Sequence, residues 1–122
     1  MLLKKIVVAE DDDAIAHLVA ATLGDAGFLC LRAHDGDEAI SLCRREAPDL
    51  LILDVMMPGL NGIEVFDRVR ADPDVQNMPV LFVTAASKDY ERQFADRRIA
   101  EVITKPFDLN DLLAKVRTLC PA

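Results

Sequence analysis

Short apolar runs alternate along this chain with longer segments in which apolar residues recur at helical spacing. The first run covers residues 6–9, and the same pattern predicts further strands at residues 28–31, 50–53, 80–83 and 102–103. A helical segment follows each run. In the first helix the predicted buried face repeats at i, i+3, i+4, i+7 and i+8 and consists of Ile15, Leu18, Val19, Thr22 and Leu23.

The predicted strands are apolar throughout, which is typical of a parallel sheet with helices on both faces. Five β-α units in 122 residues, with no interior stretch that resembles a linker, predict one doubly wound α/β domain over residues 1–122. The fourth helix, within residues 87–98, is the weakest element of the pattern. It is rich in charge and has few apolar anchors, so we expect it to be easily reordered.

The chain is acidic, with 21 acidic against 14 basic residues, a net charge of −7 and a pI near 4.7. This balance argues against direct binding to nucleic acid or to an anionic membrane surface, because both would repel the chain. No secretory leader and no apolar stretch of membrane-spanning length is recognisable, so we expect a cytoplasmic protein. Cys30, Cys43 and Cys120 are expected to be reduced packing residues.

Polar residues follow the predicted strands directly, where ligand sites of open parallel sheets lie. One or more of Asp11, Asp12 and Asp13 could simply cap the first helix. Asp54 is harder to explain in this way, because it ends an apolar run at the rim of the core. The full set is Glu10-Asp11-Asp12-Asp13 after the first strand, Asp54 after the third, Thr84 after the fourth and Lys105 after the fifth.

Glu10, Asp11 and Asp54 would repel one another at a shared sheet edge, and a hard divalent cation relieves that repulsion. Mg²⁺ suits the set because it accepts few protein ligands and keeps water or phosphate oxygens in its shell. Lys105 would place a positive charge opposite the cation, and Thr84 a hydroxyl beside a small residue. The Lys105-Pro106 bond is a candidate for a cis peptide.

Four blocks together closely resemble the receiver domain of bacterial response regulators. The resemblance covers nearly the whole chain, with each block after its expected strand. It implies a flavodoxin-like (βα)₅ fold with strand order 2-1-3-4-5, and a phosphoryl group taken from a phosphohistidine on a sensor histidine kinase or a histidine phosphotransfer protein. The blocks are Glu10-Asp11, Asp54-Val55-Met56-Met57-Pro58-Gly59-Leu60-Asn61-Gly62, Val83-Thr84-Ala85 and Thr104-Lys105-Pro106-Phe107.

By this resemblance Asp54 matches the phosphoacceptor, while Thr84 and Lys105 match the residues that contact the phosphoryl oxygens. Asp11 matches a direct Mg²⁺ ligand and Glu10 one that acts mostly through water. The backbone carbonyl of Met56 completes the protein's share of the metal shell, in which Mn²⁺ would be a substitute. The resemblance also implies a phosphorylation-controlled interaction module with a downstream protein or effector domain as its output, rather than an enzyme that turns over external substrates.

Several positions depart from the family's usual pattern. Val102 stands where the family usually has Tyr or Phe, and Arg98-Ile99 where it usually has Gly-Ala, which affects the switching face rather than the phosphorylation site. Met56 and Ala86 cannot hydrogen-bond an attacking water through their side chains, so we expect a long-lived phosphorylated state. The face of the fourth helix, fifth strand and fifth helix is a candidate homodimer surface, because related receivers place intersubunit charges at the positions of Glu101, Asp111 and Lys115.

Other residues have simpler interpretations. His17 and His34 lack partners at ligand spacing and are expected to be surface or boundary residues. Met56, Met57 and Met78 are expected to be packing residues.

Two other functional classes fit the sequence less well. A Mg²⁺-dependent aspartyl-phosphate hydrolase usually has a second aspartate two residues after its nucleophile, where this chain has Met56, and a cap domain for which there is no room. A flavodoxin-like flavin carrier lacks support, because residues 10–13 would repel the flavin phosphate. A receiver that signals without phosphorylation is a further alternative, although every residue needed for the chemistry is present.

Overall fold

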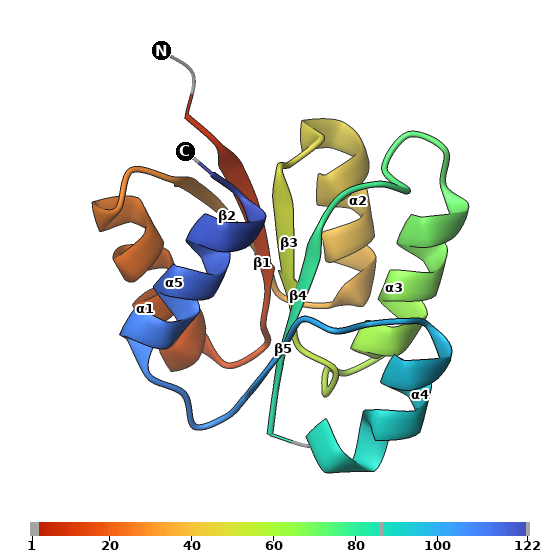
Figure 1. The fold of residues 1–122 in the computed structure, drawn as a ribbon. Coiled ribbons are helices and arrows are strands. Elements are labelled where there is room, and N and C mark those ends of the chain that lie inside the picture. The colour runs from red at the N-terminus through yellow and green to blue at the C-terminus, as the bar shows by residue number, and fades with distance from the viewer. Residues whose placement is uncertain (1–2, 86, 122) are drawn as a thin grey trace.

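Strands and helices alternate along the whole computed structural model, which describes residues 3–85 and 87–121 (Figure 1). Each predicted strand is present, within two residues of its predicted ends at most. The elements are β1 (Lys5–Ala9), α1 (Asp13–Asp25), β2 (Leu29–Ala33), α2 (Gly36–Glu46), β3 (Leu50–Leu53), α3 (Gly62–Ala71), β4 (Val80–Thr84), the 3₁₀ turn η1 (Ser87–Tyr90), α4 (Glu91–Asp96), β5 (Val102–Thr104) and α5 (Leu109–Leu119).

The five strands form one parallel sheet of order β2-β1-β3-β4-β5, which confirms the predicted doubly wound α/β fold. In the sheet register, Ala9 at the end of β1 lies opposite both Ala33 and Leu53. The strand order reverses direction after β1, so β1 and β3 lie at the centre of the sheet and the residues after them flank a topological switch point. Such points are where ligands bind in open α/β sheets.

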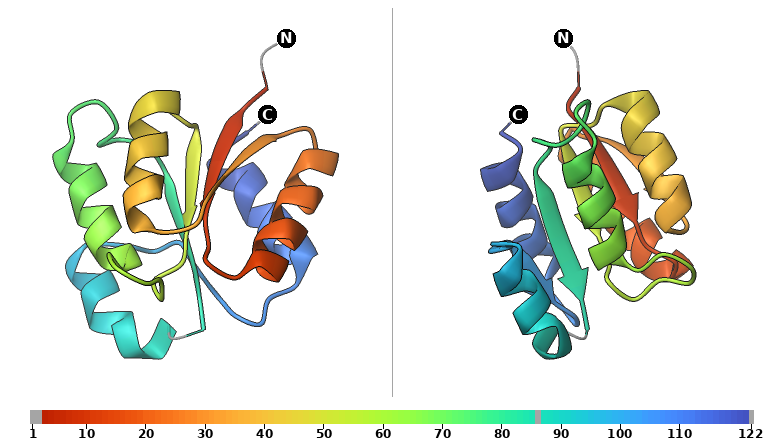
Figure 2. Two further views of the ribbon diagram at one scale, coloured as in Figure 1. Left: turned by 180° about the vertical axis from the view of Figure 1, so that it is seen from behind. Right: turned by 90° about the vertical axis from the view of Figure 1, so that its right-hand side faces the viewer.

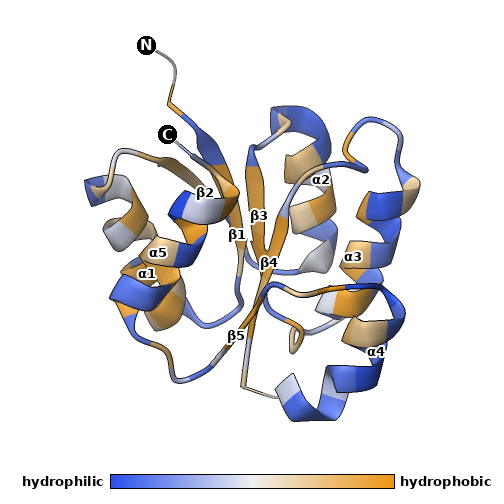
Figure 3. Cartoon of the chain, in the orientation of Figure 1, coloured by the Kyte–Doolittle hydropathy of each residue, from blue (hydrophilic) through white to orange (hydrophobic). Residues whose placement is uncertain are grey.

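Helices cover both faces of the sheet, as the apolar strands predicted. Helices α1 and α5 lie on one face, and α2, α3 and α4 lie on the other (Figures 1 and 2). The hydropathy drawing shows the strands as apolar and the outer helix faces as polar (Figure 3). Phe82 and Leu81 are fully buried at adjacent positions of β4 and belong to opposite cores. The two cores therefore share the central strands, which fixes how the strand ends align at the site.

The apolar face of α1 differs from the prediction at Leu18. Ala16, Val19 and Leu23 are buried, whereas Leu18 is 56% exposed. Ala16 belongs to the buried face of α1, so this face is rotated away from Leu18. The side chain of Leu18 therefore points toward solvent. An exposed leucine is left on the helix that begins beside the acidic loop.

Several simpler expectations are confirmed among the described residues. Cys30, Cys43 and Cys120 are free thiols, and burial raises the pKa of Cys43 to about 12. His17 and His34 are exposed. No helix in residues 3–85 and 87–121 combines the length and the apolar character needed to cross a membrane.

The fourth helix is short, and Phe94 is its single buried residue. The ring of Phe94 lies 5.1 Å from that of Phe82 and 6.4 Å from that of Tyr90, centroid to centroid. Beyond the helix, the Ile99 N–H donates to the carbonyl of Phe94 at 2.8 Å, which places Arg98 at the turn position with φ 57°. Glycine is the usual residue there, because only glycine adopts this left-handed conformation without steric strain.

We predict that Arg98→Gly raises the free energy of unfolding by about 0.5–1 kcal/mol, because relief of the left-handed strain exceeds the extra entropy of glycine in the unfolded chain. Urea denaturation would measure it. Arg98→Ala is the matched control, since alanine keeps the strain and should change the stability little. Equal stabilities of the two variants would contradict a left-handed residue at this turn.

Candidate functional site

The carboxyl ends of β1 and β3 bring Glu10 and Asp54 together at one edge of the sheet. Each residue follows its strand directly, and each is 4% exposed. The Asp54 N–H donates to the carbonyl of Ala9 at 3.1 Å, and the Glu10 N–H donates to that of Ala33 at 3.1 Å. Sheet-like hydrogen bonds thus continue one residue past the strands and hold the backbone under both carboxylates.

Three carboxylates meet at this edge. Oxygens of Glu10, Asp11 and Asp54 all lie within 4.8 Å of one another, and Asp11 is the exposed member. Asp12 has a separate role, because its carboxylate accepts from the N–H of Ile15 at 3.1 Å and caps α1. The capping interpretation therefore holds for Asp12, and the cluster formed by the other three residues remains to be explained.

Lys105 provides the positive charge of the site. Its Nζ lies 2.6 Å from Glu10 Oε1 and 2.8 Å from Asp54 Oδ2. Burial would lower the pKa of Lys105, but the hydrogen bonds to Asp54 and Glu10 outweigh this effect and raise that pKa. Burial raises the pKa of Glu10, against the opposing hydrogen bond from Lys105. Lys105 follows β5, donates its N–H to the Thr84 carbonyl at 3.0 Å, and precedes a cis peptide to Pro106, as anticipated.

Thr84 ends β4 next to the end of β3, and its side chain is fully buried. Met56 contributes through its backbone, since its N–H donates to Asp54 Oδ1 at 3.2 Å. The packing prediction is correct for Met57 and Met78 but wrong for Met56, whose side chain is 56% exposed. The backbone of Met56 turns toward Asp54, and its side chain points outward, where the Tyr90 hydroxyl donates to its sulfur at 3.6 Å.

The loop after Asp54 is held in place by the start of α3. A Cβ atom on Gly62 would collide with the carbonyl oxygen of Asp54 and would lie only 2.8 Å from the Cα of Val55. Asn61 and Glu64 form a capping box, each side chain accepting from the other's N–H, at 3.0 and 3.2 Å. The predicted role of Asn61-Gly62 in shaping this loop is confirmed, and the loop is rigidly attached to α3.

Arg32 is a contributor that sequence reasoning missed. From near the end of β2 its guanidinium donates to the carbonyl of Glu10 at 2.9 and 3.2 Å and to that of Asp11 at 3.3 Å. It also lies 2.6 Å from Asp13, and this hydrogen bond lowers the pKa of that carboxyl. The available signal was a lone arginine in an otherwise apolar strand. Arg32 fixes the backbone that presents the acidic pair.

The donor set fits a divalent cation. Three carboxylates against the single ammonium of Lys105 leave two negative charges in a partly buried cluster. Asp11 keeps an exposed carboxylate on the solvent side, and carboxylates are the ligands that hard cations prefer. A Mg²⁺-sized cation therefore matches both the charge and the chemistry of these residues.

Comparison with known proteins defines the class. The family model described as the response regulator receiver domain matches residues 6–117, and the chain belongs to this family. The chain is therefore a signalling domain of two-component systems. Members of this family take up phosphoryl groups from histidine kinases and typically bind Mg²⁺.

Similar curated proteins are response regulators. The DNA-binding dual master transcriptional regulator RpaA of Synechocystis sp. is 37% identical over 116 residues, which make up 94% of this chain and 48% of that protein. The phosphate regulon transcriptional regulatory protein PhoB of Rhizobium meliloti is 36% identical, over 97% of this chain and 52% of that protein. The chain spans about half the length of the curated relatives it matches.

Solved structures agree with the fold. The chemotaxis protein CheY4 of Vibrio cholerae superposes with a TM-score of 0.88 at 28% identity, over 97% of this chain and 99% of that one. A putative response regulator from Chloroflexus aurantiacus gives a TM-score of 0.90 at 28% identity, over 99% and 100% of the two chains. The flavodoxin-like receiver fold is confirmed.

We predict that Lys105→Met lowers the free energy of unfolding by about 3 kcal/mol without metal, because Glu10 and Asp54 stay buried without their counter-charge. Mg²⁺ should restore part of this loss. Thermal and urea unfolding with and without Mg²⁺ would measure both effects.

Lys115→Met is the control for this experiment. Lys115 pairs with Glu101 of the same chain at 3.0 Å, with both side chains more than a third exposed, and its loss should cost less than about 1 kcal/mol. Equal losses in the two variants would contradict the buried ion pairs.

Proposed function

We propose that Asp54 is the phosphoacceptor of this receiver domain and that it takes a phosphoryl group from a phosphohistidine. The observation that carries the proposal is the buried Asp54 carboxylate, with Oδ2 2.8 Å from the ammonium of Lys105 and two further carboxylates beside it. An acceptor needs positioning and charge neutralisation more than covalent help. Both are supplied by residues around Asp54.

In the transfer a carboxylate oxygen of Asp54 attacks phosphorus, the phosphorus–nitrogen bond of the donor breaks, and the electron pair stays on the histidine ring. Lys105 then exchanges its contact with Asp54 for a phosphoryl oxygen, and the Thr84 hydroxyl donates to another. Asp11 would hold Mg²⁺ or Mn²⁺ directly, together with Asp54 and the Met56 carbonyl, and Glu10 through water. When bound, the cation neutralises the oxygens of the carboxylate and the phosphoryl group.

Loss of the phosphoryl group occurs by water attack on the acyl phosphate, so the domain resets itself and turns over no external substrate. Met56 offers no hydrogen-bond donor beside the site and only a weakly accepting thioether, which the Tyr90 hydroxyl contacts, and this supports a long-lived phosphorylated state. Ala86, the other residue behind that expectation, lies outside the described residues.

The phosphodonor has a docking face next to Lys105. A mostly apolar cavity of about 460 Å³ lies beside Lys105, and Leu18, the exposed leucine of α1, lines it. A helical, apolar surface of a kinase or phosphotransfer protein fits this face and would bring its phosphohistidine to Asp54. The remaining lining residues are Ile15, Ala85, Pro106, Phe107 and Leu109.

The output is an interaction with another protein or with an attached effector domain in the cytoplasm. The chain's acidity supports a protein partner over direct contact with nucleic acid. The proposed homodimer face keeps Lys115 and Glu101 paired within one chain at 3.0 Å, so dimerisation there would require this pair to be shared or exchanged.

The first functional prediction is that incubation with Mg²⁺ and a small phosphodonor adds one acid-labile phosphoryl group, and that Asp54→Asn prevents it. Intact mass spectrometry decides the result. Asp49→Asn is a suitable control, since Asp49 lies at the opposite end of β3. Undiminished labelling of Asp54→Asn would move the acceptor elsewhere, and no labelling of the parent would favour a receiver that signals without phosphorylation.

The second functional prediction concerns how the signal spreads. Val102 is half-buried and has a short, stiff side chain that cannot reproduce the swing of an aromatic ring. Within residues 87–98, Phe94 is the one buried side chain, and the Tyr90 hydroxyl contacts the sulfur of Met56 in the acceptor loop. We therefore expect phosphorylation to reorder this segment, since a weakly anchored segment needs little free energy to shift.

Hydrogen exchange with and without beryllium fluoride would measure this response. The largest protection change should fall within residues 85–99, with a smaller change at β5. Val102→Ala should preserve the response, whereas Thr84→Ala should remove most of it. Loss of the response in Val102→Ala would show that valine is the switch residue and that the helix mechanism is wrong.

A further inference from the structure

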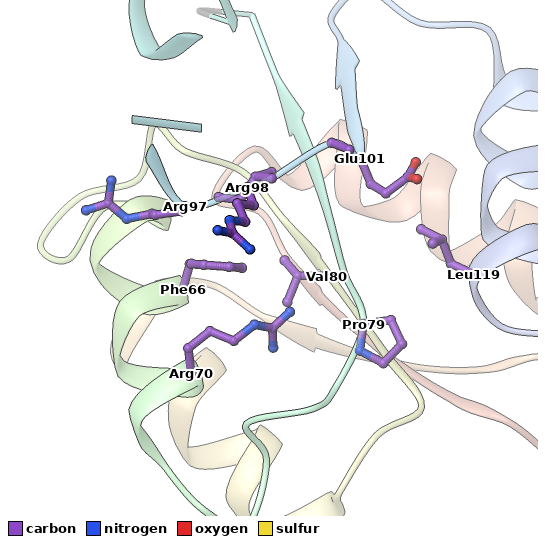
Figure 4. A pocket seen from close by; sticks show the side chains of 10 residues that line it. Phe66, Arg70, Pro79, Val80, Arg97, Arg98, Glu101 and Leu119 are labelled. Atoms are coloured by element: carbon purple, nitrogen blue, oxygen red, sulfur yellow. The ribbon is translucent and has the colours of Figure 1, made fainter. Parts of the chain in front are cut away.

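A second cavity lies at the edge of the sheet opposite to Asp54. It has a volume of about 280 Å³ and lies between α3, the end of α4 and the start of β4 (Figure 4). Strand β5 begins its pairing opposite Phe82, so the first part of β4 has no strand on that side. Much of the cavity is lined by apolar side chains, which belong to Phe66, Pro79, Val80, Ile99 and Leu119.

Two guanidinium groups face this cavity without a carboxylate partner. The Cζ of Arg70 lies 4.7 Å from the ring centroid of Phe66, and its Nη1 donates to the carbonyls of Gln76 and Met78 at 3.0 and 2.7 Å. Arg98 is exposed and makes no side-chain hydrogen bond or ion pair within residues 3–85 and 87–121. Figure 4 shows both side chains beside Phe66 and Val80.

The neighbouring charges are already compensated. Arg97, at the rim, binds both carboxylate oxygens of Asp67 at 2.6 and 2.8 Å. Glu101 is the acidic residue of the lining, and it pairs with Lys115 of α5 at 3.0 Å. In a chain of net charge −7, the free carboxylates outnumber the cations, yet none of those described reaches Arg70 or Arg98. A carboxylate that pairs with either guanidinium would therefore come from outside the described residues.

Backbone geometry makes an arginine at position 98 unexpected. A left-handed φ of 57° favours glycine, so folding alone does not account for the side chain. What the arginine adds is a guanidinium at the mouth of an apolar cavity, next to a second one. Such strained positions are often functional.

We propose that this arginine cavity (Phe66, Arg70, Pro79, Val80, Arg98 and Ile99) binds an acidic segment of a partner protein. An apolar side chain of the segment covers Phe66 and Val80, and flanking carboxylates pair with Arg70 and Arg98, whose planar donors match carboxylates. A free inorganic anion would satisfy the guanidiniums but would leave the apolar floor in contact with water. The cavity lies at the opposite edge of the sheet from Asp54, and binding of the segment requires neither Asp54 nor a phosphoryl group.

Selection from a display library of short random peptides tests the proposal. The native chain should enrich peptides in which an apolar residue is flanked by Asp or Glu, and calorimetry should show that their binding weakens with salt. Arg98→Gly should reduce the affinity by about tenfold or more, because it removes a charged hydrogen-bonding group. This variant suits the backbone, so lost binding would not reflect lost folding. Arg92→Ala, on the exposed side of α4, is the control and should bind normally.

Three results would overturn the proposal. The first is that the selection enriches no acidic peptides, or that the enriched peptides bind Arg98→Gly with the same affinity as the parent. A second is that inorganic phosphate displaces the selected peptide and shifts the same amide resonances of the cavity, which would indicate a simple anion site. The third is the same shifts on concentrating the chain alone, which would assign the cavity to a second copy. Asp54→Asn should retain peptide binding, which separates this test from that of phosphorylation.

Discussion

The ion pairs of Lys105 with Glu10 and Asp54 hold together parts of the chain that are far apart in sequence. One ammonium from the loop after β5 bridges residues 95 and 51 positions earlier, at an edge where both carboxylates are nearly inaccessible to water. Burying that many charges is unfavourable unless each is compensated. The arrangement of the strand ends and the hydrogen bonds of Arg32 to the acidic loop both serve to keep this compensation in place.

The sequence predicted the sheet well because buried parallel strands leave a simple signal. Continuous apolar runs such as β3 and β4 can hardly occupy another environment, and charged residues directly after them mark the sheet edge. The predictions failed where three-dimensional context decides the direction of a side chain. Leu18 and Met56 have apolar character but point outward, because Ala16 takes the buried position in α1 and because the Met56 backbone turns toward Asp54.

The sequence could not predict which arginines pair with which groups, because the partners are distant in the chain. The role of Arg32 depends on the register of β2 against β1, and the isolation of Arg70 and Arg98 depends on which carboxylates reach them. Neither relation has a local pattern. The sequence could predict that Glu10, Asp11, Asp54, Thr84 and Lys105 lie near one another, because each lies at or just after a strand end, and the ends of parallel strands meet at one edge of the sheet.

The close contact of Gly62 with the Asp54 backbone makes the packing around the site different on its two sides. The backbone of Asp54 and Val55 packs directly against Gly62 at the start of α3, which leaves no space for a side chain between them. On the side of β5, η1 has no buried residue and contacts the strand through the hydroxyls of Ser87 and Thr104, while α4 buries Phe94 and is tied to α3 at its end by the ion pair of Arg97 with Asp67. The backbone beside Asp54 is therefore more tightly packed toward α3 than toward η1, so a rearrangement at Asp54 is expected to cost less free energy on the side of η1.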